Sequence, residues 1–141
     1  MSQDRLRVVI TDCDHGFFDP EREVMEGVPA ELILKQLKSE EELIAACKDA
    51  DGLINQYTLL TRKVMEHLPR CKVIARYGVG VDSIDVEAAT DTGIIVANVP
   101  DYGTSEVANH AATLALTIYR RIFTAHNAIK SGIWDYQVME P

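Results

Sequence analysis

Gly78-Val79-Gly80, in the middle of the chain, offers a kind of chemistry that needs no reactive side chain. These residues directly follow a short apolar run, Val73 to Ala75, which has the character of a buried strand. Glycine carries no side chain, so the backbone amides of such a turn can face outward with nothing over them. The pattern predicts a cradle for an anion such as a carboxylate.

The same glycines also suggest the GxGxxG loop that binds the pyrophosphate of a dinucleotide. Ser83 stands where that motif has its third glycine, whose small size lets the following helix approach the strand. From these residues alone three interpretations stay open: a substrate-anion cradle, a plain turn that closes a strand–helix connection, and a pyrophosphate loop. The substitution at Ser83 makes the last of them the weakest.

Polar side chains lie next to this turn and at the end of the strand before it. Arg76 can pair bidentately with a carboxylate or phosphate, or it can join a nearby surface acid. Asn55, Gln56 and Tyr57 end a strand at the same predicted rim, where they either orient a small acid or simply finish the strand. Because Gln56 is uncharged, a phosphorylated acid receives less support as the substrate.

Acidic residues follow the first predicted strand, as they do in receiver domains that bind magnesium. Asp12 and Asp14 fit that pattern, but the third strand ends in Asn55-Gln56 and lacks the phosphorylatable Asp. Asp12 together with Cys13 and His15 also suggests a metal site. Hydrogen-bonding residues in a loop are more often turn chemistry than ligands, so we predict no metal.

Strands and helices alternate around these residues. Apolar runs predict strands at residues 6–11, 30–37, 51–56, 73–75 and 94–97. Capping and stop residues predict helices at 20–26, 39–48, 61–68 and 85–92, with Ser39, Thr61 and Gly93 among the signals. Residues 30–37 fit strand or helix, and the alternation after Pro29 favours a strand. The order predicts an α/β fold: a flavodoxin-like or Rossmann-like parallel five-stranded sheet with flanking helices.

A long helix is expected after this sheet. Residues 104–130 contain no Gly or Pro, and their apolar side chains cover more than one stripe. At 1.5 Å per residue such a helix would reach roughly 40 Å, too long for a compact domain of this size. We therefore expect an interdomain helix that leaves the first domain and packs on a second domain or subunit.

Composition and charge narrow the possible partners. The chain has 141 residues and a formal charge of −8, which argues against nucleic acid as a partner. The longest apolar stretch, residues 111–119, is too short to span a membrane, and the N-terminal residues lack the apolar core of a signal peptide. Three widely spaced cysteines without a CxxC pair suggest reduced thiols. We expect a cytoplasmic protein.

The stretch RYGVGVDSIDVEAATDTGIIVANVPDYGTSEVA resembles the D-isomer-specific 2-hydroxyacid dehydrogenases, and the likeness extends from VVITDCD to SGIWD. The resemblance implies a small 2-hydroxy or 2-keto acid as substrate and NAD or NADP as cofactor. It implies that the loop amides hold the substrate carboxylate and that Val79 also touches the nicotinamide. A substrate-contacting side chain is expected near Gln56. The candidate substrate-binding residues are Gln56, Tyr57, Arg76, Tyr77, Gly78, Val79 and Gly80.

Members of this family are usually more than twice as long, so the resemblance implies a fragment. Their nucleotide fingerprint and catalytic Arg, Glu and His lie beyond the matched region, which predicts a substrate-binding domain at residues 1–103. Residues 104–141 would hold the interdomain helix, the start of the nucleotide-binding domain and a homodimer contact. Asn109 departs from the family, which usually has an acidic residue there.

No histidine in the chain fits the proton donor that 2-keto acid reduction requires. His15, His67, His110 and His126 are all better explained as surface or helix-packing residues, so we expect no catalytic residue and no turnover by this chain alone. A second hypothesis is a non-catalytic module that senses a small acid or binds a protein partner, as corepressor relatives do.

Overall fold

The computed structural model describes residues 5–139. Contacts divide the chain into two compact units, Met1–Pro100 and Asp101–Pro141, which are described separately below. The assignment of a function to each part remains a prediction.

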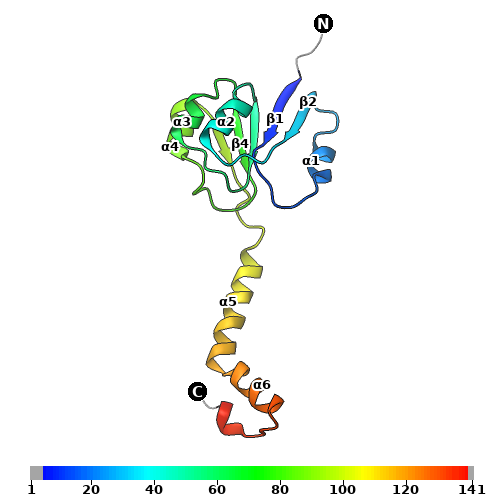
Figure 1. The fold of residues 1–141 in the computed structure, drawn as a ribbon, viewed down its shortest axis with the longest axis vertical. Helices are drawn as coiled ribbons and strands as arrows, with labels where there is room; N and C mark the ends of the chain where they lie inside the picture. Colours follow the sequence, from blue (N-terminus) through cyan, green and yellow to red (C-terminus); the bar gives the residue numbers. More distant parts are fainter. Residues whose placement is uncertain (1–4, 140–141) are drawn as a thin grey trace. The chain divides into compact units, whose positions relative to one another are not determined.

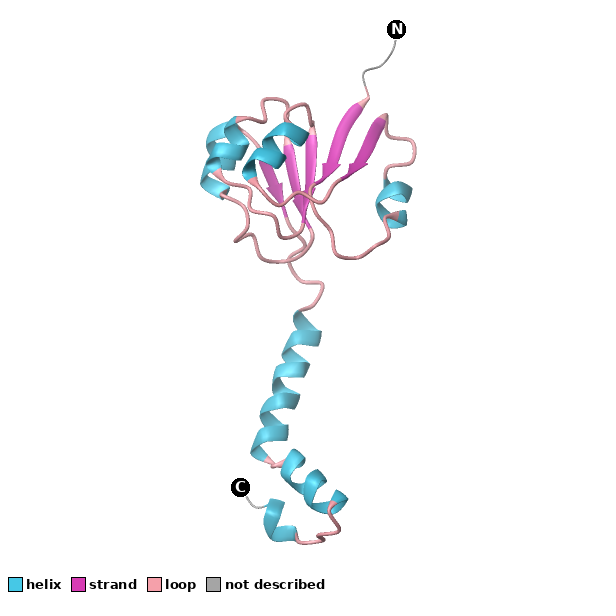
Figure 2. Cartoon of the chain, in the orientation of Figure 1, coloured by secondary structure: helices cyan, strands magenta, loops and turns pink. Residues whose placement is uncertain are grey.

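The first unit is built on five parallel strands, as the sequence predicts (Figures 1 and 2). The strands are β1 (Leu6–Ile10), β2 (Ala30–Leu34), β3 (Gly52–Asn55), β4 (Val73–Arg76) and β5 (Ile95–Ala97). Their order in the sheet is β2-β1-β3-β4-β5, which is the flavodoxin-like order. The chain therefore changes direction across the sheet between β1 and β3, where ligands bind in open α/β sheets.

Four helices flank this sheet on both faces. They are α1 (Asp19–Val24), α2 (Glu40–Cys47), α3 (Arg62–Glu66) and α4 (Val86–Thr92). Helices α2, α3 and α4 cover one face, whose core includes Val9, Leu53 and Ile74 from the central strands. Helix α1 lies toward the other face, where Pro20 and Val24 line a pocket with Ile54.

The helix ends form as the capping residues predict. Ser39 Oγ accepts a hydrogen bond from Glu42 N, and Thr61 Oγ1 accepts one from Val64 N. Asp85 caps α4 through Ala88 N at 2.8 Å. Gly93 ends α4 with φ 73°, a left-handed conformation that glycine adopts without a steric penalty. The sheet edge that carries the site is thus fixed by local sequence signals.

The prediction of one continuous helix over residues 104–130 is wrong. The structure has two helices, α5 (Thr104–Tyr119) and α6 (Ile122–Lys130), followed by the 3₁₀ turn η1 (Tyr136–Met139). The break lies at Arg121, whose φ of 52° is left-handed, and Arg120 N closes α5 on Leu116 O at 2.9 Å. The bend lets α6 contact both α5 and η1 and buries Ala125. Such packing offsets the local backbone strain at Arg121.

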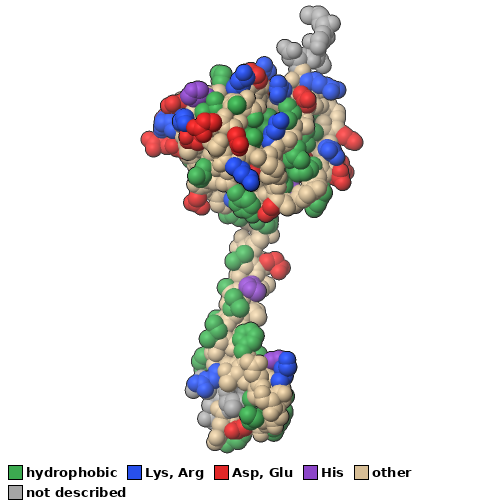
Figure 3. Space-filling view, viewed as in Figure 1, with side chains coloured by type: hydrophobic (Ala, Val, Ile, Leu, Met, Phe, Trp, Pro, Cys, Tyr) green, Lys and Arg blue, Asp and Glu red, His purple; other side chains and the backbone are tan. Residues whose placement is uncertain are grey.

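Apolar side chains are exposed along α5 and α6 (Figure 3). They include Leu116, Ile118, Tyr119, Ile122 and Phe123. Among the described residues, none of the helices combines the length and apolar character that crossing a membrane requires.

Candidate functional site

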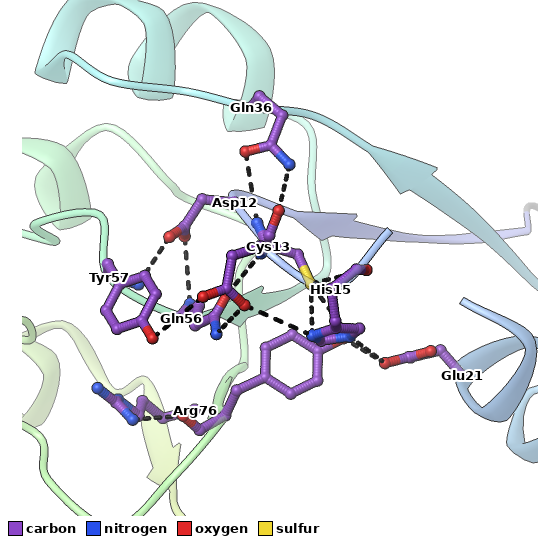
Figure 4. Close-up of polar contacts among 10 residues, drawn as sticks. Asp12, Cys13, His15, Glu21, Gln36, Gln56, Tyr57 and Arg76 are labelled. Atoms are coloured by element: carbon purple, nitrogen blue, oxygen red, sulfur yellow. Dashed lines mark hydrogen bonds and ion pairs between the residues drawn. The ribbon is translucent and has the colours of Figure 1, made fainter. Parts of the chain in front are cut away.

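The candidate residues gather at the carboxyl edge of the sheet, where loops follow β1, β3 and β4 (Figure 4). Because all strands are parallel, these three loops meet at one edge. Asn55 at the end of β3 pairs in register with Arg76 at the end of β4. Tyr77 N donates to Asn55 O at 2.9 Å, so the loops that follow β3 and β4 begin next to each other.

In the Gly78-Val79-Gly80 loop the first two carbonyls accept hydrogen bonds, whereas the three amides donate none among the described residues. Gly78 O accepts from Val99 N at 3.0 Å, and Val79 O accepts from Asn98 Nδ2 at 2.8 Å. Within the described residues, the amides of Gly78, Val79 and Gly80 donate no hydrogen bond. Unpaired backbone donors need an acceptor when a ligand removes them from water.

Glycine is required at the first position of this loop for a conformational reason. Gly78 has φ 125°, a region that side chains with a Cβ rarely adopt. Gly80 is constrained less strongly, since a Cβ there would lie 3.2 Å from Asp82 Oδ2. The loop conformation that frees the amides therefore depends chiefly on Gly78.

Arg76 lies beside this loop with part of its guanidinium unused. Its Nη1 donates to Tyr77 O, and its buried Nε has no hydrogen-bond partner among the described residues. A buried N–H without a partner is unfavourable, so this conformation of the Arg76 side chain is not fully satisfied by the protein itself. Among the residues that the structure describes, Arg76 forms no ion pair with an acid, which favours the anion-binding interpretation over a surface ion pair.

The side chain of Gln56 is held by Asp14. Gln56 Nε2 donates to Asp14 Oδ1 at 2.7 Å, while Asp14 N donates to Gln56 Oε1 at 2.8 Å. Tyr57 is 63% exposed, and its hydroxyl lies 3.3 Å from Asp14 Oδ2. A carboxylate thus stands beside both predicted contacts from β3, a feature that sequence reasoning did not anticipate.

The side chain of Tyr77 is directed toward α1. Its hydroxyl donates to Glu21 Oε1 at 2.6 Å, and its ring meets the His15 ring edge-on with centroids 5.2 Å apart. Burial and the hydrogen bond to the Glu21 carboxylate raise the pKa of Tyr77. Tyr77 therefore supports the wall of the site rather than offering a free hydroxyl.

Asp12 organises the loop after β3 and was not among the predicted site residues. Its Oδ2 accepts from Tyr57 N at 2.6 Å and Thr58 N at 3.1 Å, and its Oδ1 accepts from Gln56 N at 3.1 Å. Burial alone would raise the pKa of Asp12, but the backbone donors at Tyr57 and Gln56 outweigh it and lower the pKa. The Asp at the end of β1 is the only sequence signal that could have indicated this role.

Cys13, Asp14 and His15 place a sulfur, a carboxylate oxygen and a ring nitrogen within 4.8 Å of one another. Burial is the main reason that the pKa of Cys13 is raised, with the charges of Asp14 and Glu21 adding to it. His15 is thus a member of a polar cluster at the site edge, not an isolated surface residue. The other histidines lie elsewhere: His67 ends α3, His110 is on α5 and His126 is on α6.

Comparison with known proteins finds a matching family model and similar sequences. The family model of the D-isomer specific 2-hydroxyacid dehydrogenase catalytic domain matches residues 8–134. The D-3-phosphoglycerate dehydrogenase of Methanocaldococcus jannaschii is 40% identical over 131 residues, covering 92% of this chain and 24% of that protein. The glyoxylate reductase of Pyrococcus furiosus is 39% identical over 95 residues, covering 67% of this chain and 28% of that protein. The chain thus spans about a quarter of the length of these relatives.

Solved structures show the same fold. The NAD+-bound 3-phosphoglycerate dehydrogenase of Entamoeba histolytica superposes with a TM-score of 0.70 and 26% identity, covering 84% of this chain and 41% of that one. The NADPH-dependent glyoxylate/hydroxypyruvate reductase of Sinorhizobium meliloti, in complex with citrate, superposes with a TM-score of 0.73 and 27% identity. The match covers 98% of this chain and 42% of that one. With the family match over most of its length, the chain belongs to the D-isomer specific 2-hydroxyacid dehydrogenases.

Proposed function

We propose that this chain is the substrate-binding part of an NAD- or NADP-dependent oxidoreductase that interconverts a small D-2-hydroxy acid and its 2-keto acid. The observation that carries the proposal is the loop at Gly78-Val79-Gly80, in which the carbonyls of Gly78 and Val79 are paired and all three amides are free within the described residues. The guanidinium of Arg76, which donates to Tyr77 O and forms no ion pair among the described residues, adds a positive charge next to the same loop. Together they suit a carboxylate better than a neutral ligand.

The residues present fit one side of a nicotinamide and no more of the cofactor. Val79 is 47% exposed at the tip of the loop, so its side chain is free to contact the ring, whereas Ser83 occupies the third glycine position of a pyrophosphate loop. When bound, the cofactor supplies or accepts the hydride. In our proposal this chain binds and orients the acid, and residues outside the 141 hold most of the cofactor.

We further propose that these 141 residues do not turn over by themselves. The reaction needs a proton donor next to the substrate carbonyl. His15 lies at the correct edge, but its ring nitrogens are 2.9 and 3.0 Å from Cys13 Sγ, and Nε2 is 3.6 Å from Glu21 Oε1. Measurable reduction of glyoxylate or hydroxypyruvate with NADH or NADPH by the purified chain would contradict this part of the proposal.

The favoured substrate class is an unphosphorylated acid. Asp14 stands beside Gln56 and Tyr57, and its side chain is 65% exposed. A second negative group on the substrate would meet this carboxylate and be repelled. The uncharged amide of Gln56 offers no compensating positive charge.

Binding to the loop can be tested directly by NMR. We expect D-glycerate to shift the backbone amide signals of Val79 and Gly80 in the ¹⁵N-labelled chain, and 3-phospho-D-glycerate to bind more weakly. Arg76→Met should weaken D-glycerate binding by about tenfold or more, since hydrogen bonds to charged groups contribute about 1.5–3 kcal/mol.

The exposed Arg22 on α1 provides the matched control, and Arg22→Met should leave D-glycerate affinity unchanged. The proposal fails if D-glycerate leaves the loop signals unmoved, or if both arginine variants bind equally well. Tighter binding of the phosphorylated acid would contradict the substrate class alone.

We also propose that the chain forms a homodimer through α5 and α6, supported by the apolar side chains exposed on these helices. Light scattering should give about twice the chain mass of 15.7 kDa. Ile118→Glu together with Phe123→Glu should give a monomer, because charges are unfavourable in an apolar contact. Val24→Glu, an equally exposed apolar position on α1, is the control. A monomeric wild-type chain would refute the dimer.

A further inference from the structure

Tyr77 directly precedes Gly78-Val79-Gly80, the acid-binding loop, and is held both at its backbone and at its side chain. Its N–H donates to Asn55 O at 2.9 Å, and its carbonyl oxygen accepts from Arg76 Nη1. Its hydroxyl donates to Glu21 Oε1 at 2.6 Å. Because the peptide bond is planar, the orientation of the Tyr77 carbonyl also determines that of the N–H of the next residue. The groups that hold Tyr77 therefore set the direction of the first amide of the loop.

The contact from Glu21 comes from a distant part of the chain. The other two contacts come from the ends of β3 and β4, whereas Glu21 lies on α1, 56 residues before Tyr77. The side chain of Glu21 is only 13% exposed, although those of Asp19 and Arg22 on the same helix are 86% and 72% exposed. Burying a carboxylate is unfavourable unless hydrogen bonds replace the lost water. The inward orientation of Glu21 on this short helix therefore depends on its contact with Tyr77.

His15 contacts both members of this pair from the loop after β1. Its ring meets the Tyr77 ring edge-on with centroids 5.2 Å apart, and its Nε2 lies 3.6 Å from Glu21 Oε1 (Figure 4). Burial alone would raise the pKa of Glu21, but hydrogen bonds from the Tyr77 hydroxyl and from its own backbone N–H outweigh burial and lower the pKa. The Tyr77 hydroxyl thus donates to an ionised oxygen, and such a bond is stronger than one between neutral groups.

We propose that Glu21 is a positioning residue for the acid-binding loop and acts through the Tyr77 hydroxyl. This role rests on the proposed function, in which the loop amides hold the substrate carboxylate. Glu21 itself contacts neither the acid nor the cofactor. It keeps the Tyr77 side chain directed toward α1, so that the peptide between Tyr77 and Gly78 is already oriented before the acid binds. A loop whose donors are oriented in advance loses less conformational entropy on binding than a mobile loop does.

Removing either end of the Glu21–Tyr77 hydrogen bond should weaken acid binding. Glu21→Ala and Tyr77→Phe are each expected to weaken D-glycerate binding by about three- to tenfold, a limited loss because both backbone contacts of Tyr77 remain. The double variant should bind no more weakly than the weaker-binding single variant, because Glu21 acts only through the Tyr77 hydroxyl. NMR titration of the ¹⁵N-labelled chain measures all three affinities.

Glu21→Gln tests rescue by a conservative change, since its amide oxygen still accepts from the Tyr77 hydroxyl. We expect its D-glycerate affinity to stay within about twofold of the wild type. Glu23→Ala, which removes an exposed acid from the same helix, is the matched control and should bind like the wild type. Urea unfolding of each variant measures its stability, because a contact that merely attaches α1 to the sheet would lower stability and leave the affinity unchanged.

Spectra of the free chain separate this proposal from the proposed function. Without ligand, Glu21→Ala and Tyr77→Phe should each shift the amide signals of the acid-binding loop, and Glu23→Ala should leave them in place. Unshifted loop signals in Glu21→Ala would refute the positioning role whether or not the wild type binds D-glycerate. So would wild-type affinity in Glu21→Ala, or a double variant in which the two single losses multiply. Failure of the wild type to bind D-glycerate would instead refute the proposed function.

Discussion

Gly78→Val is expected to destabilise the chain by about 2–3 kcal/mol and to abolish D-glycerate binding by the loop. The first effect follows from φ 125° at this residue, a conformation that a β-branched side chain adopts only under strain. The second follows because relief of that strain rotates the peptide that follows Gly78 and misaligns the free amides of Val79 and Gly80. Urea unfolding followed by circular dichroism gives the stability, and NMR titration gives the binding.

Gly16→Val is the matched control for this prediction. Gly16 lies in the same unit, has no left-handed φ, and a Cβ built there meets nothing within 4 Å. We expect its unfolding midpoint to stay close to that of the wild type. If the two valine variants unfold at the same urea concentration, the loop is not held in the conformation described here. If Gly78→Val binds D-glycerate normally, the amides are not the acid-binding groups.

Much of the fold could be predicted because its signals are local. The apolar runs at β1, β3 and β4 and the caps at Ser39 and Thr61 each depend on residues close in sequence. The end of α5 at Tyr119 could not be predicted in this way. Arg120-Arg121 contains neither Gly nor Pro, and the break there depends on packing that involves Ala125 and η1.

The candidate site was likewise only partly predictable from the sequence, and for the same reason. The turn at Gly78 is visible in the sequence, because glycine spacing and the preceding strand are local features. The partner of Gln56 is not visible, since Asp14 lies 42 residues away and reaches it only through the β1–β3 pairing. Single residues thus identified where the loop would form, and tertiary contacts decided which side chains remain free to bind.

The polar network around Asp12 leads to the other large effect. Asp12→Ala is expected to destabilise the chain by about 3–4 kcal/mol, because backbone donors at Gln56, Tyr57 and Thr58 lose their acceptor. Asp12 is 8% exposed, so water replaces the carboxylate poorly. Asp12→Asn should also destabilise substantially, since its NH₂ group would face one of these donors. Urea unfolding of both variants measures the loss.

Asp14→Ala is the control that separates the hydrogen-bonding role of Asp12 from a general effect of removing an acidic residue from the loop after β1. Asp14 is two residues away, but its side chain is 65% exposed and its partners are the side chains of Gln56 and Tyr57. We expect it to cost about 1 kcal/mol or less. Similar losses of stability in Asp12→Ala and Asp14→Ala would refute the proposed role of Asp12 as acceptor for the backbone amides of the loop after β3. A large loss in Asp12→Ala alone would mean that one buried carboxylate after β1 sets the conformation of the loop after β3, and with it the position of Gln56 and Tyr57.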